Sequence, residues 1–379
     1  MRFINAVVCG PDFHFKQGEF SVENGRFVRV LSASTEPATD LDGAYVIPGL
    51  IDIHNHGNSG CDFSDGDLGG LVIIAKYLAK NGITSFAPAS LTLPEEQLTR
   101  AFQTAVEFSG QPYADCAVLR GIHMEGPFFS EKKKGAQNSA FLRTPDFEMF
   151  LRLNRAANGL IKIADIAPEL PGSLEYIKGV TQVCTVSIAH TDANYDQSKA
   201  AIEVGVTHVT HLFNAMPPFL HRSPGVIGAA AESKQVRAEL ICDGLHVHES
   251  AVRGAIAMFG AERICLVSDA LSCCGLPTGE YMLGGQKIFL DGMVARLTDE
   301  PETLAGSATN LFEIFRHACS FGIPIEDAVR MASYNPACAI SVEQEVGSIE
   351  NGKRADFIIL SKDLSLRSVY VGGTELGRI

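Results

Sequence analysis

The apolar and polar positions at the two chain ends follow a pattern typical of short β-strands. No helical period appears in the first 48 residues, and Asn24-Gly25 marks a hairpin turn between two expected strands. Past residue 340 the chain returns to the same short apolar stretches separated by turns. The strands that this pattern predicts are Arg2–Val8, Gly18–Val22, Phe27–Leu31, Phe357–Leu360 and Ser368–Val371. We expect the two ends, residues 1–48 and 340–379, to pair into one small β-sandwich domain.

Between these ends the pattern changes to an alternation of apolar strands and helix-like stretches. The expected strands are Ile51–His54, Ser85–Pro88, Val118–Met124, Ile161–Ile166, Thr185–His190, His208–His211, Glu239–Cys242 and Ile264–Ser268. The helical segments between them include Leu68–Asn81, Glu95–Ser109, Asp146–Asn158, Asp196–Glu203 and Ser250–Phe259. Strand–helix alternation predicts a parallel sheet, and eight such strands predict a closed (β/α)8 barrel of the TIM type over residues 49–339. An open, doubly wound sheet is the alternative arrangement.

The composition limits the compartments and partners that suit the chain. Of its 379 residues, 46% are hydrophobic and 20% are charged, and the formal net charge is −13. This acidic balance argues against nucleic acid and anionic membranes, which attract basic surfaces, although a few local cations would suffice for a small anionic substrate. No apolar run reaches the ~18 residues of a membrane span, and ten cysteines are too sparse for a disulfide scaffold in a chain this long. These features predict a cytoplasmic protein.

Side chains that can bind metal stand at the carboxyl ends of the predicted barrel strands. His54 and His56 close the first strand, and residues two apart on a strand point to the same side, so both imidazoles can face one ion. The ends of later strands carry Glu125, His190, His211 and Asp269. In a (β/α)8 barrel the strand ends meet at the mouth that holds the active site. We therefore expect these side chains to form a metal centre.

The residue types in this set indicate a catalytic metal. Imidazole and carboxylate ligands without thiolate suit Zn at a catalytic centre, with Fe, Mn or Ni as alternatives. Taken singly, a strand histidine is usually a hydrogen-bonded core residue, and Asp269 could cap a helix, so the argument rests on the joint placement. His123 faces the same way as Glu125, and we expect it to support the ligands rather than to bind the ion.

Several stretches carry a resemblance to a known family. The stretch Pro48–His56 looks like the opening motif of the amidohydrolase superfamily. More narrowly, the chain resembles the N-acetylglucosamine-6-phosphate deacetylases, essentially from end to end. The stretches that carry this likeness are His123–Pro127, Ala189–Ala193, His211–Met216, Asp243–His246, Leu304–Ser307 and Gly347–Asp356.

The resemblance implies a role for each candidate side chain. Glu125, His190 and His211 resemble the family's principal metal ligands, and Asp269 resembles its general base and acid beside the metal. His54 and His56 match members that keep an H-x-H pair and can hold a second ion, with Glu125 as the expected bridge. The residues expected to contact the sugar phosphate are Ala136, Gln137, Asn214, Ala215, Arg222, Asp243, His246, Leu304, Ala305 and Gly306.

Two of these positions have a chemistry of their own. Some family members carry His where this chain has Gln137, and Gln can donate a hydrogen bond to an acetyl carbonyl but cannot be cationic. Arg222 stands eleven residues after His211, on a loop expected near the mouth, and its planar guanidinium suits a phosphate group.

The activity that the resemblance implies is the metal-dependent deacetylation of N-acetyl-D-glucosamine 6-phosphate to D-glucosamine 6-phosphate and acetate, in amino-sugar catabolism. Three alternatives stay open: the same reaction on the galactosamine epimer, a cyclic-amide hydrolase of the same superfamily in which a carboxylated Lys162 would bridge the metals, and an inactive scaffold. Scaffolds of this kind typically lose ligands, and here every candidate ligand is present. The partners expected are an amino-sugar phosphate and a second copy of the chain in a homodimer, with no nucleic acid and no membrane.

Overall fold

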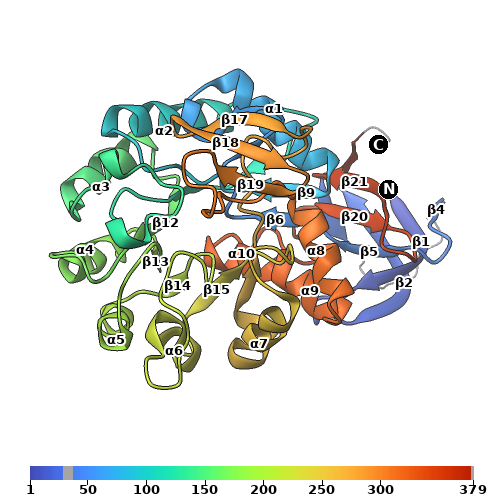
Figure 1. Ribbon diagram of the computed structural model, residues 1–379. Coiled ribbons are helices and arrows are strands. Elements are labelled where there is room, and N and C mark those ends of the chain that lie inside the picture. Colours follow the sequence, from blue (N-terminus) through green and yellow to red (C-terminus); the bar gives the residue numbers. More distant parts are fainter. Residues whose placement is uncertain (29–36, 377–379) are drawn as a thin grey trace.

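The computed structural model describes residues 1–28 and 37–376, and the two ends of the chain share one β-sheet. Its strands are β1 (Arg2–Cys9), β2 (Phe15–Glu23), β3 (Arg26–Val28), β4 (Thr39–Asp40), β5 (Tyr45–Pro48), β20 (Phe357–Leu360), β21 (Leu366–Val371) and β22 (Thr374–Glu375). The strand order is β22-β21-β20-β5-β1-β2-β3, with β4 paired to β1 (Figure 1). The predicted strand Phe27–Leu31 begins within β3, and its residues 29–31 lie outside the described residues.

Aromatic packing holds the two ends of the chain together. Phe357 stacks on Tyr370 with ring centroids 4.3 Å apart, and it meets Phe20 edge-on at 5.2 Å. These rings are buried in one cluster with Phe3 and Phe27, away from the barrel core. β20 also pairs antiparallel with β5, the strand that leads into the barrel. The small β domain built from both ends is therefore confirmed, while its boundaries at residues 48 and 340 stay a prediction.

The middle of the chain forms a closed barrel of eight parallel strands. They are β6 (Leu50–Asp52), β9 (Ile83–Phe86), β10 (Val118–Leu119) continued by β11 (Ile122–Met124), β12 (Ile161–Ile166), β13 (Thr185–Ile188), β14 (His208–Val209), β15 (Arg237–Leu240) and β16 (Ile264–Leu266). Hydrogen bonds link β10-β9-β6 in one run and β11 to β16 in another. Ala89 joins the runs on one side by pairing with His123, and the Asp269 N–H joins them on the other by donating to the His54 carbonyl at 2.8 Å. This closure confirms the barrel and excludes the open sheet.

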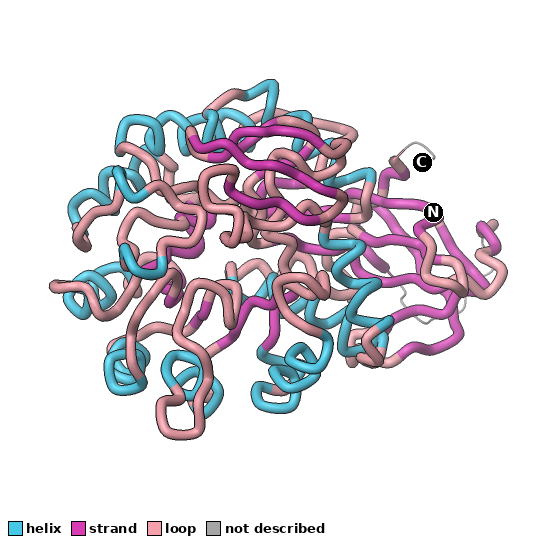
Figure 2. The backbone as a smooth tube through the Cα atoms, in the orientation of Figure 1, coloured by secondary structure: helices cyan, strands magenta, loops and turns pink. Residues whose placement is uncertain are grey.

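Helices surround the barrel strands as an outer ring (Figure 2). They are α1 (Leu68–Lys80), α2 (Glu95–Ser109), α3 (Phe147–Ala156), α4 (Ser173–Val180), α5 (Tyr195–Glu203), α6 (Gly225–Glu232), α7 (Glu249–Phe259), α8 (Leu311–Ser320), α9 (Ile325–Ala332) and α10 (Tyr334–Ala339). In α1 the residues Leu71, Ile74 and Leu78 recur at helical spacing and are buried against the strands, while the Asp67 side chain caps the first turn. The predicted helices agree with the observed ones to within about two residues, the usual uncertainty of helix ends.

A three-stranded antiparallel sheet that the sequence pattern does not predict lies between β16 and α8. Its strands are β17 (Gly279–Leu283), β18 (Gln286–Asp291) and β19 (Val294–Leu297). Gly284 and Gly285 form the turn with positive φ angles of 53° and 83°, which glycine adopts readily. The sheet is tied to the loop after β11, since Gln286 Nε2 donates to the Ala136 carbonyl at 2.6 Å.

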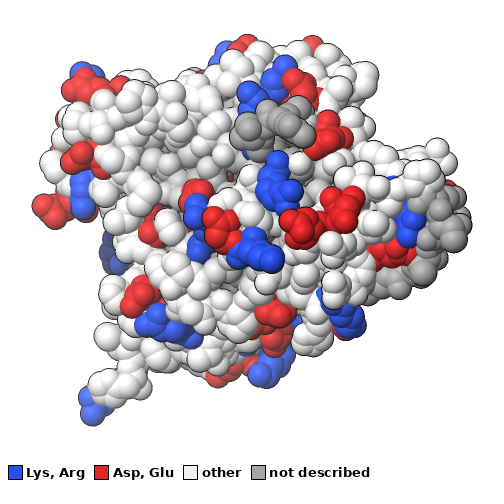
Figure 3. Space-filling view, turned by 90° about the vertical axis from the view of Figure 1, so that its right-hand side faces the viewer, with Lys and Arg blue, Asp and Glu red and all other residues white. Residues whose placement is uncertain are grey.

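The surface carries no single dominant charge on the face seen in Figure 3. Acidic and basic side chains are interspersed there rather than gathered into one patch. Among the helices of the described residues, none is both long and apolar enough to cross a membrane.

Candidate active site

Each candidate metal ligand follows a barrel strand at its carboxyl end. His54 and His56 follow β6 and Glu125 follows β11, while His190, His211 and Asp269 follow β13, β14 and β16. The last three residues have positive φ angles of 43°, 31° and 49°, a region that residues other than glycine rarely occupy. Such conformations cost about 1–3 kcal/mol each and cluster at functional sites. The backbone thus turns sharply where these side chains enter the barrel mouth.

Glu125, His190 and His211 form the first ligand group. Glu125 Oε1 lies 3.0 Å from His190 Nε2 and 3.3 Å from His211 Nε2, and the two imidazole nitrogens are 3.1 Å apart. All three side chains are buried. Two ring nitrogens and one carboxylate oxygen converge on one point, which is the donor arrangement of a catalytic divalent ion.

His54, His56 and Asp269 form the second group. His56 Nε2 lies 3.2 Å from Asp269 Oδ1, and His54 Nε2 lies 3.6 Å from the same oxygen. His54 Nε2 is buried and has no hydrogen-bond partner. A buried ring nitrogen aimed at two carboxylates is expected where a cation fills the gap.

Glu125 connects the two groups. Its Oε1 faces His190 and His211, whereas its Oε2 lies 3.3 Å from His56 Nε2. Glu125 thus contacts histidines of both groups, and its role as a bridge between two ions stays a prediction.

Asp269 is held in its ionised form. Burial would raise the pKa of this carboxyl group, but the facing imidazoles of His54 and His56 outweigh that effect and keep the pKa below its usual value. An ionised carboxylate at the mouth can take up a proton, which is the role expected of a general base.

A cavity of about 260 Å³ opens directly over these ligands. That volume lies just below the ~300–1,000 Å³ range of small-molecule sites. The candidate ligands in its wall are His56, Glu125, His190, His211 and Asp269, with His54 lying beneath them.

Sequence comparison assigns this architecture to one family. The sequence model of the Amidohydrolase family matches residues 45–376, which span the barrel and part of the β domain. The chain belongs to the amidohydrolase family.

Relatives of known name extend this result along the whole amidohydrolase chain. The N-acetylglucosamine-6-phosphate deacetylase of Bacillus subtilis (strain 168) is 37% identical over 322 residues, which cover 84% of this chain and 81% of the relative. The enzyme of the same name from Lysinibacillus sphaericus is 35% identical over 375 residues, covering 97% and 96%. The solved structure of a mutant N-acetyl-D-glucosamine-6-phosphate deacetylase from Mycobacterium smegmatis, in complex with N-acetyl-D-glucosamine-6-phosphate, has a TM-score of 0.93 and 31% identity over 99% of both chains. The resemblance read from the motifs is confirmed.

Most of the predicted substrate residues meet in this cavity of the amidohydrolase barrel. Those in its wall are Ala136, Gln137, Asn214, Ala215, His246, Leu304, Ala305 and Gly306. Asp243 lies behind the wall, where its Oδ2 contacts His246 Nδ1 at 2.7 Å and so orients the ring. The contacts of these residues with a substrate stay a prediction.

Arg222 is the predicted substrate residue that this cavity does not include. It is exposed on the loop between β14 and α6, at the carboxyl end of the barrel. It lines a separate surface cavity together with Asp192 and Asp196. Its expected contact with a phosphate group therefore stays a prediction that the cavity itself does not support.

The Gln137 side chain forms two hydrogen bonds that its sequence position does not predict. Its Nε2 donates to Glu125 Oε2 at 2.8 Å, and its Oε1 accepts the Thr92 backbone N–H at 2.8 Å. The Thr92 donor fixes which end of the amide is oxygen, since an N–H cannot pair with an NH2 group. The amide thus holds the Glu125 carboxylate, and this leaves one N–H of Nε2 for a substrate.

Some site residues are not predicted from the sequence. Glu239, in the middle of β15, is fully buried beneath the ligands and contacts His54 Nδ1 at 2.7 Å. Its only sequence signal is an acidic residue at the start of the predicted strand Glu239–Cys242, which is otherwise apolar. Leu91 and Leu283 also line the cavity, and Leu283 comes from the unpredicted three-stranded sheet.

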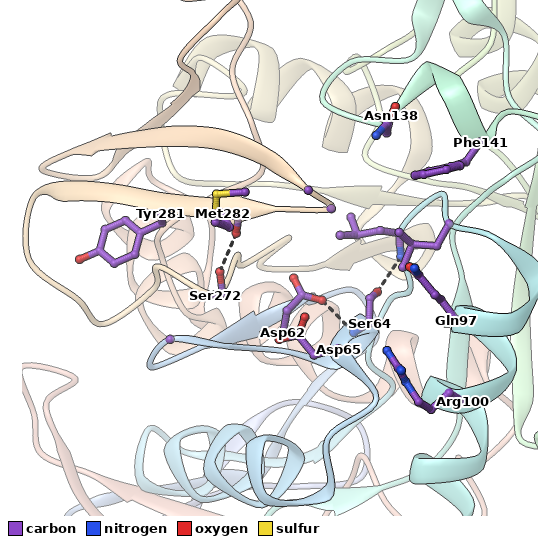
Figure 4. Close-up of a pocket in the computed structure, with 15 residues that line it drawn as sticks. Asp62, Ser64, Asp65, Gln97, Arg100, Asn138, Phe141, Ser272, Tyr281 and Met282 are labelled. Atoms are coloured by element: carbon purple, nitrogen blue, oxygen red, sulfur yellow. Dashed lines mark hydrogen bonds between the residues drawn. The ribbon is translucent and has the colours of Figure 1, made fainter.

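A larger cavity of about 760 Å³ adjoins the site (Figure 4). It shares Leu91 with the site cavity, and α2 and the β17–β18 hairpin form its walls. Figure 4 shows Asp62, Asp65 and Arg100 near its floor and Tyr281 and Phe141 on opposite sides. None of the residues lining it is a candidate ligand or a predicted substrate residue. The convergent ligands, rather than the volume, therefore identify the active site.

Proposed function

We propose that this amidohydrolase removes the acetyl group from N-acetyl-D-glucosamine 6-phosphate and releases D-glucosamine 6-phosphate and acetate, a step of amino-sugar catabolism. The observation that carries the proposal is the convergence of four imidazoles and two carboxylates under a small cavity. The chain is also related over nearly its whole length to N-acetylglucosamine-6-phosphate deacetylases. The Mycobacterium smegmatis relative binds the N-acetylated sugar phosphate itself.

The residues present fit one or two divalent ions per chain, and we propose Zn. Glu125, His190 and His211 would hold the first ion, and His54, His56 and Asp269 would complete a second site with Glu125 between them. The unpartnered Nε2 of His54 supports the second site. A divalent ion bound there supplies a Lewis acid that makes water nucleophilic near neutral pH and polarises the acetyl carbonyl.

The chain's own side chains supply the proton transfers and the positioning. Asp269 can accept a proton from the attacking water and deliver it to the departing amine. Leu91, Leu271 and Leu283 line the cavity and offer an apolar contact for the acetyl methyl group. His246 is oriented by Asp243 through Nδ1, and its Nε2, 3.3 Å from the Ala305 carbonyl, can donate to the sugar or to the acetyl carbonyl oxygen in place of that contact.

The structure disfavours the cyclic-amide alternative. Lys162 is the second residue of β12 and therefore lies toward the amino end of that strand, away from the mouth. The position between the two ligand groups is taken by Glu125. A carboxylated lysine from the fourth strand has no place in this arrangement.

Acetate release from four compounds tests the function. The metal-loaded enzyme is incubated with the 6-phosphates of N-acetylglucosamine and N-acetylgalactosamine and with both unphosphorylated sugars. We expect the highest kcat/KM for N-acetylglucosamine 6-phosphate. A preference for the galactosamine epimer would replace the proposed substrate, and no acetate from any of the four would refute deacetylation.

We also propose that the protein is a cytoplasmic homodimer and that Arg222 binds the phosphate group of the substrate. All ten cysteines lie among the described residues and are free thiols, which suits a reducing compartment. The dimer rests on the family resemblance, and light scattering of the purified enzyme tests it, since a monomeric mass would refute it.

A further inference from the structure

Glu239 lies at the centre of a buried polar cluster under the metal ligands. Its Oε2 is 2.7 Å from His54 Nδ1 and 3.2 Å from the His211 backbone nitrogen. Its Oε1 is 3.2 Å from His208 Nε2. No part of Glu239 is exposed. The carboxylate therefore touches one candidate ligand through its ring and another through its backbone.

These contacts determine which nitrogen of His54 can bind an ion. A carboxylate only accepts hydrogen bonds, so His54 must carry its proton on Nδ1 and donate it to Glu239. The lone pair then sits on Nε2, the nitrogen that faces Glu125 and Asp269 and has no partner. Glu239 thus sets both the tautomer and the direction of the His54 ring.

His54 differs in this respect from the other candidate imidazoles. The Nδ1 atoms of His56 and His190 contact the backbone carbonyls of Ala89 and Lys133 at 3.2 and 2.9 Å. Among the candidate imidazoles, only His54 has a carboxylate behind it, and a carboxylate partner raises the basicity of an imidazole ligand more than a neutral carbonyl does.

We propose that Glu239 is the positioning residue of the second metal site, which it creates by holding His54 as a ligand. The inference rests on the two-ion site proposed above. It predicts that Glu239 controls the affinity of the second ion far more than that of the first ion, since Glu239 contacts the first-ion ligand His211 only through its backbone nitrogen.

A third ion among His54, His123 and Glu239 is the competing interpretation, because their donor atoms also lie close together. Each of these side chains, however, already has a hydrogen-bond partner. Glu239 accepts from His54, and His123 contacts the Ile53 carbonyl at 3.0 Å and Asp165 at 2.9 Å. An ion there would have to break these bonds, so the cluster serves as a support for the site above it.

Two substitutions separate the charge of Glu239 from its hold on the ring. In Glu239→Gln the amide oxygen can still accept hydrogen bonds from His54 and His211. The amide NH2 group then faces Nε2 of His208, and the His208 ring can carry its own proton on Nδ1, which has no partner. Glu239→Ala removes both the charge and the hydrogen bond that orients the His54 ring. Loss of an outer partner typically weakens metal binding about 10–100-fold. We expect about tenfold weaker binding of the second ion in Glu239→Gln and up to about a hundredfold in Glu239→Ala.

The experiment titrates metal-free enzyme with Zn²⁺ against a chromophoric chelator and fits two dissociation constants per chain. Asp165→Asn is the matched control, since Asp165 is an equally buried barrel carboxylate that contacts His123 and Thr210 but no candidate ligand. We expect it to bind both ions as the wild type does. Co²⁺ titrations followed by visible absorption report the ligand environment of each site without reference to activity.

A double-mutant cycle decides whether Glu239 acts through His54. If it does, His54→Asn with Glu239→Gln binds the second ion no more weakly than His54→Asn alone. Additive losses, an unchanged second ion in both Glu239 variants, or equal weakening in Asp165→Asn would each overturn the inference. A wild type that binds only one ion would overturn it together with the two-ion site, whereas the deacetylase activity is measured separately and could stand without either.

Discussion

The Gln137 side chain offers the sharpest test of how the Glu125 carboxylate is held. Gln137→Ala removes two buried hydrogen bonds, one to the charged Glu125 and one from the Thr92 N–H. A hydrogen bond to a charged group contributes about 1.5–3 kcal/mol and a neutral one about 0.5–1.5 kcal/mol, so the metal-free protein should lose about 2–4.5 kcal/mol of unfolding free energy. The freed Glu125 should also bind metal about 10–100-fold more weakly.

Urea unfolding of the chelated protein and Zn²⁺ competition titrations measure the two effects. Gln97→Ala is the control, because Gln97 is an exposed glutamine that lines the neighbouring cavity, and it should change neither quantity. Suppose that Gln137→Ala lowered kcat alone, with the wild-type stability and metal affinity. Gln137 would then act only on the acetyl carbonyl, and its role in holding Glu125 would be refuted.

Substitutions at three further places test the remaining roles. Asp269→Asn should lower kcat by about 10²–10⁴-fold, the usual contribution of a general base, and should leave the first ion bound; a loss within tenfold in steady-state acetate release would remove Asp269 from that role. His54→Asn combined with His56→Asn should reduce bound Zn, counted by elemental analysis, from two ions to one, and a wild type that never exceeds one ion would contradict this. Arg222→Ala should reduce the kcat/KM ratio of phosphorylated over plain substrate by about ten- to over a hundredfold, because a charge-assisted contact of about 1.5–3 kcal/mol is lost. Arg222→Lys should fall between Arg222→Ala and the wild type. An unchanged ratio would show that Arg222 does not bind the phosphate.

Local patterns were enough to predict the architecture and to select the candidate ligands that the structure brings together. The alternation of apolar strands with helix-like stretches is read within a window of a few residues, and it predicts the barrel because parallel strands need helical crossovers. Each candidate ligand was selected because it stands shortly after the end of an apolar strand: His54, His56, Glu125, His190, His211 and Asp269. The carboxyl ends of the barrel strands meet at one mouth irrespective of the loops that follow them. Sequence position alone therefore predicts that these side chains come together.

Contacts between segments distant in the sequence were decided only by the tertiary structure. Glu239 lies 185 residues from His54, and nothing in an apolar strand indicates which ring its carboxylate will meet. Gln137 holds Glu125 rather than standing free, because the Thr92 N–H captures its oxygen. Arg222, expected near the mouth from its loop position and from the family resemblance, lines a separate surface cavity on the long loop after β14, and its contact with a phosphate stays a prediction. The periodicity of apolar residues predicts which face of a helix or strand is buried. Hydrogen-bond partners depend instead on how loops and strands from distant parts of the chain pack together, and no local pattern contains that information.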